Sequence, residues 1–167
     1  MAALRAAAPD ASWVRAGNLH LTLRFLGEVD ATRAGVLAES LRPLVARHPV
    51  IDTALARAGA FPDVLRPRVI WIGVRDTGPV SSLAADVELA CAAAGFESET
   101  RPFNAHVTLG RVKRRLGRDA AGSLESAARA FTTTYPARIA AVDLMQSELT
   151  PGGSRYSLVV SLPLGAA

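Results

Sequence analysis

Two short stretches of the chain repeat one pattern, a histidine followed two residues later by a threonine within an alternating apolar run. The first stretch holds His20 and Thr22, and the second holds His106 and Thr108. The chain has 167 residues and three histidines, so most of its histidines lie in these stretches. Because side chains two apart in a strand project from one face, we expect each stretch to present an imidazole beside a hydroxyl.

These groups suit the cleavage of a phosphodiester. A neutral imidazole can take a proton from water while a protonated one gives a proton to the leaving oxygen, and an unperturbed histidine pKa of about 6.5 makes both states available near neutral pH. Threonine hydroxyls can donate hydrogen bonds to the non-bridging oxygens, where charge grows in the transition state. No carboxylate or cysteine accompanies the histidines at ligand spacing, so we expect no metal and no other cofactor.

Strict alternation also assigns the neighbours of the first motif. A strand over 18–26 places Arg24 on the same side as His20 and Thr22. The apolar residues of this strand then face the core: Leu19, Leu21, Leu23 and Phe25.

Arg111 follows the second motif and does not fit strict alternation. It lies three residues after Thr108, which directs it to the opposite face of the strand. Two interpretations remain open. Either Gly110 hosts a β-bulge that turns Arg111 back toward the histidine, or Arg111 is the first cation of an exposed basic run.

That basic run holds five cations between residues 111 and 118: Arg111, Lys113, Arg114, Arg115 and Arg118. The chain as a whole carries a net charge of +4, which favours anionic partners such as nucleic acid or phosphate. A charge run alone says little, so a solvated loop and an RNA contact are both open here.

The composition indicates one globular domain. Half of the residues are hydrophobic, which is enough for a core, and no apolar run approaches the roughly 20 residues that span a bilayer. The single cysteine, Cys91, excludes an internal disulfide and falls on the apolar face of a predicted helix, which favours a core thiol. We expect a cytoplasmic monomer without membrane contact.

Periodicity predicts the remaining elements. We expect helices over about 31–47, 78–95 and 119–130, and strands over 50–58, 68–74, 104–110, 137–148 and 154–163, with a turn at 150–153 joining the last two. Pro43 predicts a kink or a break in the first helix. His48 is interpreted as a partner of the helix dipole or a surface residue, and Trp71 as a core residue.

Hairpins among these strands favour antiparallel pairing. We therefore predict an α+β fold of two similar lobes, with two mainly antiparallel sheets flanking a central cleft and helices outside. If the polar faces of the two motif strands meet there, the cleft contains two imidazoles and two hydroxyls.

Four stretches of the sequence resemble one known family. They are the first motif from Asn18 to Glu28, Phe61-Pro62 with the strand from Pro67 to Val74, the second motif from Phe103 to Lys113, and the closing hairpin from Ser147 to Tyr156. Together they resemble the 2H phosphoesterase superfamily, and within it the bacterial and archaeal RNA 2′,3′-cyclic phosphodiesterases, also called 2′-5′ RNA ligases. The resemblance covers residues 13–164.

The resemblance implies a single bilobal domain over 1–167 with one His-x-Thr strand in each lobe. It implies hydrolysis of an RNA 2′,3′-cyclic phosphate to a 2′-phosphate, with His20 as proton donor and His106 as proton acceptor. The phosphate-binding residues of the family correspond to Thr22, Thr108 and Arg111, which favours the bulge at Gly110. Some relatives also join RNA ends through a 2′-5′ linkage.

Two departures from the family are visible. Ala105 stands where the family usually has proline, which removes rigidity but no chemistry. Seventeen residues precede Asn18, whereas relatives usually begin with an extra strand and helix. Either the start of the chain is misassigned or one lobe lacks a strand and exposes a sheet edge.

Two alternatives to this RNA hydrolase remain open. In the first, the chain is a module that binds RNA ends or nucleotides without turnover. In the second, it is a phosphodiesterase that acts on another small cyclic phosphate.

Overall fold

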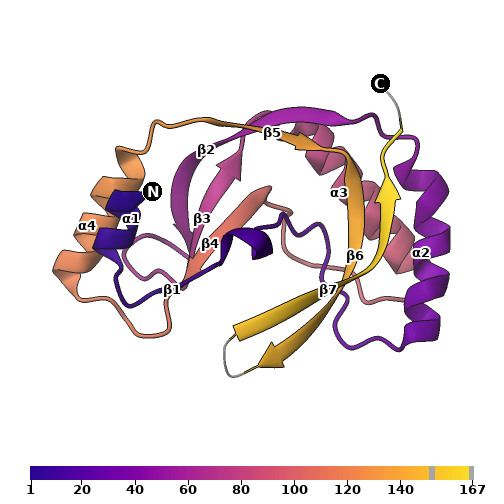
Figure 1. Ribbon diagram of the computed structural model, residues 1–167, viewed down its shortest axis with the longest axis horizontal. Helices are drawn as coiled ribbons and strands as arrows, with labels where there is room; N and C mark the ends of the chain where they lie inside the picture. The colour runs from indigo at the N-terminus through magenta and orange to yellow at the C-terminus, as the bar shows by residue number, and fades with distance from the viewer. Residues whose placement is uncertain (151–152, 166–167) are drawn as a thin grey trace. The chain divides into compact units, whose positions relative to one another are not determined.

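The computed structural model describes residues 1–150 and 153–165, and the chain divides into two compact units (Figure 1). Unit 1 consists of Met1–Thr22, Thr53–Thr77 and Ala105–Ala137. Unit 2 consists of Leu23–Asp52, Gly78–Asn104 and Arg138–Ala167. Each unit therefore gathers three separate segments of the chain.

Unit 1 is built on a five-stranded sheet in the order β1-β4-β3-β2-β5. Its strands are β1 (Ser12–Trp13), β2 (Ile51–Phe61), β3 (Val69–Val74), β4 (His106–Arg111) and β5 (Tyr135–Ile139). The pairs β1–β4, β3–β4 and β2–β3 are antiparallel. The centre of this sheet is thus formed by the predicted strands 68–74 and 104–110.

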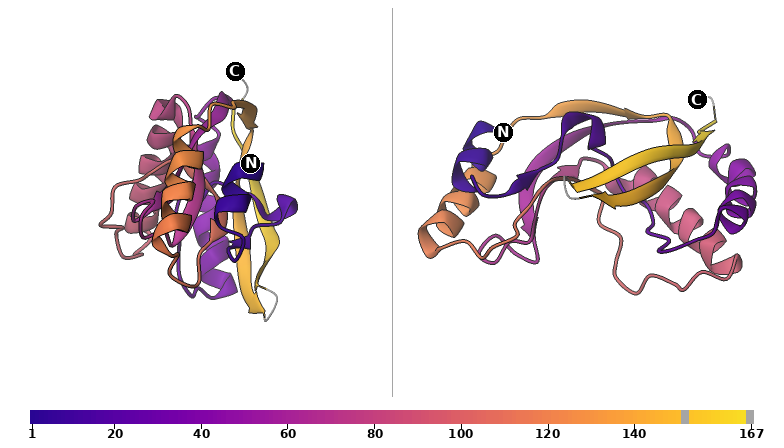
Figure 2. Two further views of the ribbon diagram at one scale, coloured as in Figure 1. Left: turned by 90° about the vertical axis from the view of Figure 1, so that its left-hand side faces the viewer. Right: turned by 60° about the horizontal axis from the view of Figure 1, so that its bottom comes forward.

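One face of this sheet is apolar and packs against two helices, α1 (Ala2–Ala7) and α4 (Arg118–Arg129). The two helices lie side by side (Figures 1 and 2). Alternation along β3 turns Ile70 and Ile72 into the core, where they meet Leu4 of α1 and Leu124 of α4. The opposite face of β3 is left for Val69, Trp71 and Gly73.

Unit 2 combines a two-stranded antiparallel sheet, β6 (Ala141–Thr150) and β7 (Gly153–Pro163), with α2 (Ala31–Val45) and α3 (Thr77–Ala93). Helix α2 packs on both strands. Arg33 at its start donates to the carbonyl oxygen of Gly95 at 2.8 Å, just after α3. His48, just after α2, contacts the Asp86 carboxylate of α3 at 2.9 Å. His48 is therefore a half-buried partner of Asp86 rather than a surface residue, and its place just after α2 keeps the interpretation as a dipole partner a prediction.

The α+β class with antiparallel sheets is confirmed, as are the predicted helices. Asp30 caps α2 by accepting from the backbone N–H of Arg33 at 2.9 Å. Pro43 lies in the last turn and does not break the helix. Within the described residues, no helix is long and apolar enough to cross a bilayer. The predicted turn at 150–153 lies partly outside the described residues, which omit 151–152.

The single strand predicted over 137–148 is wrong. The structure has two strands there, β5 in the sheet of unit 1 and β6 paired with β7 in unit 2, with a break at Ala140. Each part keeps β geometry, so the residues satisfy their strand propensity. The chain changes its pairing partner between them because the segment passes from one unit to the other.

The strand predicted over 18–26 is also wrong. A 3₁₀ helix, η1 (Ala16–Asn18), precedes it, and Leu21 makes an isolated bridge rather than part of a strand. Leu19 and Phe25, predicted to face the core, are 44% and 73% exposed. The chain leaves unit 1 after Thr22, so the alternating pattern cannot continue along the sheet.

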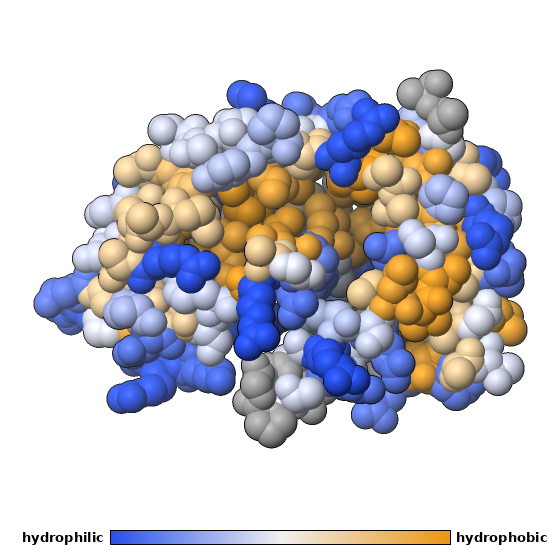
Figure 3. All heavy atoms as spheres, in the orientation of Figure 1, coloured by the Kyte–Doolittle hydropathy of each residue, from blue (hydrophilic) through white to orange (hydrophobic). Residues whose placement is uncertain are grey.

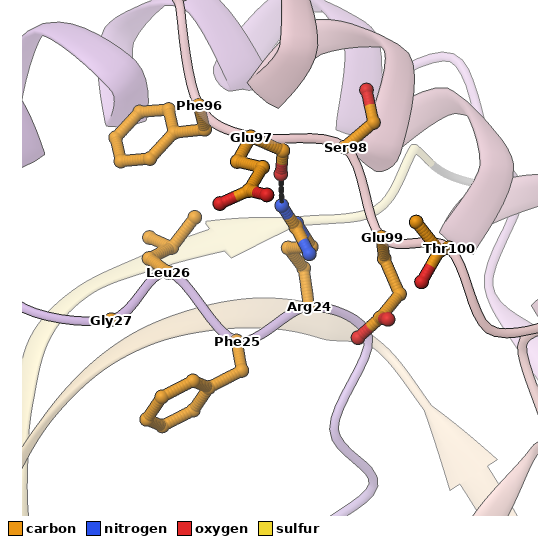
Figure 4. Close-up of a pocket in the computed structure, with 9 residues that line it drawn as sticks. All are labelled: Arg24, Phe25, Leu26, Gly27, Phe96, Glu97, Ser98, Glu99 and Thr100. Atoms are coloured by element: carbon orange, nitrogen blue, oxygen red, sulfur yellow. Dashed lines mark hydrogen bonds between the residues drawn. The ribbon is translucent and has the colours of Figure 1, made fainter.

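Arg24 belongs to unit 2 and does not extend the first motif. Its Nε lies 2.9 Å from a carboxylate oxygen of Glu88 in α3, and its side chain is only 11% exposed. Its guanidinium also donates to the backbone carbonyl of Glu97. Figure 4 shows Arg24 pointing toward Glu97 while Phe25 points away. The prediction that Arg24 shares a face with His20 was wrong, because this ion pair holds it against α3.

The hollow beside Arg24 has a volume of about 310 Å³ and is lined within unit 2 by residues 24–27 and 96–100. Two of its lining residues are acidic, Glu97 and Glu99. Arg101 beside Glu99 lowers the pKa of that carboxyl to about 2. Arg24, the one cation among the lining residues, is already paired with Glu88. These charges do not suit a phosphate group.

The core contains Cys91, which is 1% exposed on α3, as its place on the apolar face predicts. Burial raises the pKa of the Cys91 thiol. The thiol is therefore kept in its neutral form and packs as a small apolar side chain.

We expect Arg24→Ala to destabilise the protein by about 2–4 kcal/mol, because it leaves the partly buried Glu88 carboxylate without its partner. The free energy of unfolding in urea measures this effect. Arg42→Ala is the matched control, since its ion pair with Glu39 is exposed and surface pairs contribute little. Equal stability of the two variants would contradict a structural role for Arg24.

Candidate active site

Strand β4 brings both motifs together. Its own residues include His106 and Thr108, and one of its edges pairs with β3. The segment that leads to the first motif runs antiparallel along the other edge, where Trp13 lies opposite Gly110. After η1 the same segment returns to this edge, and Leu21 forms an antiparallel bridge with Val107. The two repeats, far apart in sequence, are thus neighbours within unit 1.

The Leu21–Val107 bridge sets the arrangement of the four motif side chains. In an antiparallel pair with 21 opposite 107, His20 lies opposite Thr108 and Thr22 opposite His106. Val107 is buried in the core of unit 1 and Leu21 packs against the same core. The residues on either side of each therefore project from the other face, which we call the motif face.

The two histidines are diagonal neighbours on the motif face. In an antiparallel pair such diagonal positions are roughly 7–8 Å apart. His20 and Thr22 are exposed, whereas His106 and Thr108 are half-buried. The first motif is therefore open to solvent, while the second is set into the sheet.

The expectation of one motif strand in each lobe does not hold for these compact units. His20, Thr22, His106 and Thr108 all lie in unit 1, and the chain passes into unit 2 directly after Thr22. The physical reason is that β1 covers only the end of this edge of β4, at Gly110 and Arg111, and Leu21 pairs farther along the same edge with Val107. The four residues therefore flank one bridge within a single unit.

A β-bulge places Arg111 on the same face. Thr108 pairs with Trp71 and Gly110 pairs with Ile70, so Leu109 is an extra residue in β4. Leu109 is buried in the core and Gly110 pairs with the core-facing Ile70. Arg111 then pairs with Val69, which lies on the motif face. The shift that the sequence suggested at Gly110 thus occurs at Leu109–Gly110, and it compensates for the three-residue spacing.

The 3₁₀ helix η1 orients His20. The Nδ1 atom of His20 lies 2.7 Å from the carbonyl oxygen of Asn18, the last residue of η1. A carbonyl oxygen only accepts, so Nδ1 must carry the proton and donate it. In the neutral ring the lone pair is then on Nε2, and in the cation the second proton is there. Nε2 is therefore the ring atom of His20 that this hydrogen bond leaves for proton exchange.

Two aromatic rings support His106 on the motif face. The Phe61 ring centroid lies 5.0 Å from that of His106 with an interplanar angle of 83°, and the Trp71 ring lies at 6.4 Å. The two aromatic rings contact each other at 5.3 Å. These edge-to-face contacts restrict the imidazole of His106. The prediction that Trp71 is a core residue was wrong, because Trp71 alternates with the buried Ile70 and Ile72.

Gly59 on β2 makes room for the indole of Trp71. A Cβ atom at position 59 would lie 2.4 Å from the six-membered ring of Trp71. Gly59 pairs with Trp71 across the sheet, so the ring lies over the glycine. Sequence reasoning missed this support for His106. No local signal separates Trp71 from the buried isoleucines, because Val69–Val74 is apolar throughout.

The other candidate residues lie elsewhere. His48 and Cys91 are in unit 2, and Lys113, Arg114 and Arg115 are exposed beyond the end of β4. Across residues 1–150 and 153–165, no group of three or more His, Cys, Asp and Glu side chains has the geometry to hold a metal ion. The chemical groups of the motif face are therefore two imidazoles, two hydroxyls and one guanidinium.

A family model matches the chain in two successive parts. The model of the LigT like phosphoesterase family matches residues 1–71 and again residues 72–156. The first part contains His20 and the second contains His106. The internal repeat of the sequence thus coincides with the division of the family match.

Relatives of known name agree with this match. An RNA 2′,3′-cyclic phosphodiesterase of Methanothermobacter thermautotrophicus is 30% identical over 154 residues, which cover 92% of this chain and 83% of the relative. One of Geobacillus stearothermophilus is 35% identical over 103 residues, which cover 62% of this chain and 33% of the relative. The chain thus spans most of the first relative but about a third of the second.

A solved structure has the same fold. The crystal structure of Escherichia coli LigT complexed with 3′-AMP superposes with a TM-score of 0.72 and 29% sequence identity. The superposition covers 96% of this chain and 86% of the LigT chain. From the paired motifs, the twofold family match and this shared fold, the chain belongs to the LigT like phosphoesterase family, a group of 2H phosphoesterases.

Proposed function

We propose that this chain hydrolyses the 2′,3′-cyclic phosphate of RNA to a 2′-phosphomonoester, with two histidines as acid and base and without a metal. The observation that carries the proposal is the bridge between Leu21 and Val107. It gives one sheet face the two proton-transfer groups that a phosphodiester hydrolysis needs. Arg111 joins them through the bulge in β4.

In this mechanism His106 takes a proton from the attacking water while the water oxygen bonds to phosphorus. The bond between phosphorus and the 3′ oxygen breaks, and His20 gives that oxygen a proton from Nε2. Thr22 and Thr108 donate to the non-bridging oxygens, and Arg111 neutralises their charge. Proton exchange with solvent then returns both histidines to their starting protonation states.

The relatives support this assignment of substrate. Several carry the name RNA 2′,3′-cyclic phosphodiesterase, and the LigT structure was solved with 3′-AMP, a nucleotide. With a 5′-hydroxyl of RNA in place of water, the same displacement would give a 2′-5′ linkage, so ligation is a possible second activity of the same site. A cytoplasmic location and a monomeric state stay predictions from the sequence.

We expect the purified protein to convert a cyclic-ended oligoribonucleotide to the 2′-phosphate in the presence of EDTA. His20→Ala and His106→Ala should each lower kcat by about 10²–10⁴-fold, which is the usual contribution of an acid or base. Chromatography of the product identifies the 2′-phosphate.

The control is His48→Ala, which changes the third histidine in unit 2 and should keep its activity once its folding is verified by circular dichroism. Binding of the oligonucleotide by folded wild-type protein without any product would favour a binding module. Turnover of small cyclic phosphates but not of RNA ends would favour the other phosphodiesterase.

We expect Gly59→Ala to lower kcat by up to about 10²-fold with a smaller change in KM. The added Cβ displaces the Trp71 indole against His106, and a misplacement of about 1 Å has this cost. Steady-state kinetics on the cyclic substrate measures it. Gly122→Ala in α4 is the control, because a Cβ there meets nothing within 4 Å.

The double variant Gly59→Ala with Trp71→Leu relieves the clash. We expect it to recover part of the lost kcat. Unchanged kinetics of Gly59→Ala, in a protein of normal stability, would remove Trp71 from the positioning of His106.

A further inference from the structure

The positive charge of the chain is concentrated in the unit that carries both histidines. Unit 1 has twelve Lys and Arg residues against five Asp and Glu, a formal charge of +7. Unit 2 has seven against ten, a formal charge of −3. A general preference for arginine in the coding sequence would raise the arginine content of both units alike. The asymmetry therefore points to an anionic partner of unit 1.

Much of this charge lies in the segment 111–118, which we call the basic loop. It leads from the end of β4 to the start of α4 (Figure 1). Strongly hydrophilic side chains gather at the same lower left edge in Figure 3. The cations of the basic loop are exposed. They are Arg111, Lys113, Arg114, Arg115 and Arg118.

Two apolar side chains hold the basic loop against the core of unit 1. Val112 is 5% exposed in the core of unit 1, and Leu116 packs against the same core. The N–H of Val112 also donates to the carbonyl oxygen of Arg68 at 2.9 Å, which ties the loop to the segment before β3. The cations between these two anchors therefore project from a fixed backbone, and little conformational entropy of the backbone is lost on binding.

These cations lack acidic partners in the folded protein. Among residues 1–150 and 153–165, no ion pair joins a carboxylate to Arg68 or to any cation of the basic loop. Arginines elsewhere are paired, such as Arg101 with Glu99 and Arg138 with Asp52. A cluster of like charges repels itself, so an anion that neutralises it would bind favourably.

The basic loop is continuous with the site. Arg111 is its first residue and shares the motif face with Thr108 through the bulge in β4. Arg68 precedes Val69, which pairs with Arg111. An RNA strand whose cyclic phosphate contacts Arg111 therefore meets further cations directly beyond that contact.

We propose that the basic loop and Arg68 bind the phosphate backbone of the single-stranded RNA whose cyclic end is cleaved. This inference rests on the proposed function and adds the surface that binds the rest of the RNA strand beyond its cyclic end. A 2′,3′-cyclic phosphate is the 3′ end of a strand, so all other phosphates lie on one side of it. A single cationic surface that leads away from the histidines matches this arrangement.

The recognition is electrostatic rather than sequence-specific. Aromatic residues make up 5% of the chain, and none lies between residues 111 and 118, so a platform that stacks successive bases is missing from the basic loop. Arginine and lysine bind phosphates of any sequence, and the affinity falls as salt rises.

The test uses the triple variant Lys113→Gln, Arg114→Gln and Arg115→Gln, which keeps Arg111 and the motif residues. We compare KM for a nucleoside 2′,3′-cyclic phosphate and for a ten-residue oligoribonucleotide with a cyclic end. The mononucleotide should keep its kcat and KM. The oligonucleotide should show a KM raised at least tenfold at low salt, and the slope of log KM against log salt should fall by about 2.

A matched control removes the same charge elsewhere. The variant Arg42→Gln, Arg47→Gln and Arg101→Gln changes three exposed arginines of unit 2. We expect it to leave KM for the oligonucleotide nearly unchanged. Equal losses in the two triple variants, or equal losses on both substrates, would overturn the proposal.

A binding measurement separates this proposal from the proposed function. Fluorescence anisotropy of a labelled single-stranded oligoribonucleotide reports its Kd for the wild type and the triple variant, whether or not turnover occurs. A weaker Kd for the variant supports the surface even if hydrolysis fails. An unchanged Kd overturns it even if hydrolysis succeeds. Displacement of the RNA by an equal concentration of poly-glutamate would assign the surface to acidic protein segments instead.

Discussion

The candidate site depends on one backbone contact, the antiparallel bridge between Leu21 and Val107 on the edge of β4 that also carries β1. Val107 is part of the core of unit 1, and the half-buried Leu21 packs against that core. Packing of these two apolar side chains toward the core therefore favours the emergence of the imidazoles of His20 and His106 on the other face. The chemistry on the motif face and the packing behind it are two sides of the same pairing.

Most residues that hold the site are apolar. Val107 and Leu109 keep β4 seated on the core, and Phe61 and Trp71 confine the imidazole of His106. Gly59 contributes by the absence of a side chain. His106 and Thr108 stand on a strand rather than on a loop, which gives this half of the site the precise positioning that proton transfer needs.

Much of the fold could be predicted because helices and buried strands carry local periodic patterns. The capped helix after Asp30 and the strand around Ile70 and Ile72 are of this kind. The segment 18–26 also alternates, yet it forms no strand, because the chain leaves the sheet at Thr22. An alternating pattern indicates which side chains would share a face of a strand, but it does not indicate whether a neighbouring strand is there to pair with.

The residues of the candidate site could be named from the sequence, but their supports could not. The repeated His-x-Thr is a signal in residue identity, so it is visible without coordinates. The contact of Trp71 with His106 and the space over Gly59 depend on the register of β2, β3 and β4. Register arises from pairing across long stretches of chain, and no local pattern around Trp71 states it. Trp71 therefore looked like one more apolar residue of a buried run.

The bulge in β4 has a consequence for how such sequences change over time. The extra residue at Leu109 makes the number of residues between Thr108 and Arg111 more important than their identity. Leu109 has only to fill the core, and position 110 has only to stay small beside the Trp13 ring, which a Cβ there would approach to 3.2 Å. A single deletion between them would turn the guanidinium into the apolar interior, whereas substitutions of similar size would keep it on the motif face. The spacing from threonine to arginine is thus a feature by which a functional second motif can be told from a chance His-x-Thr.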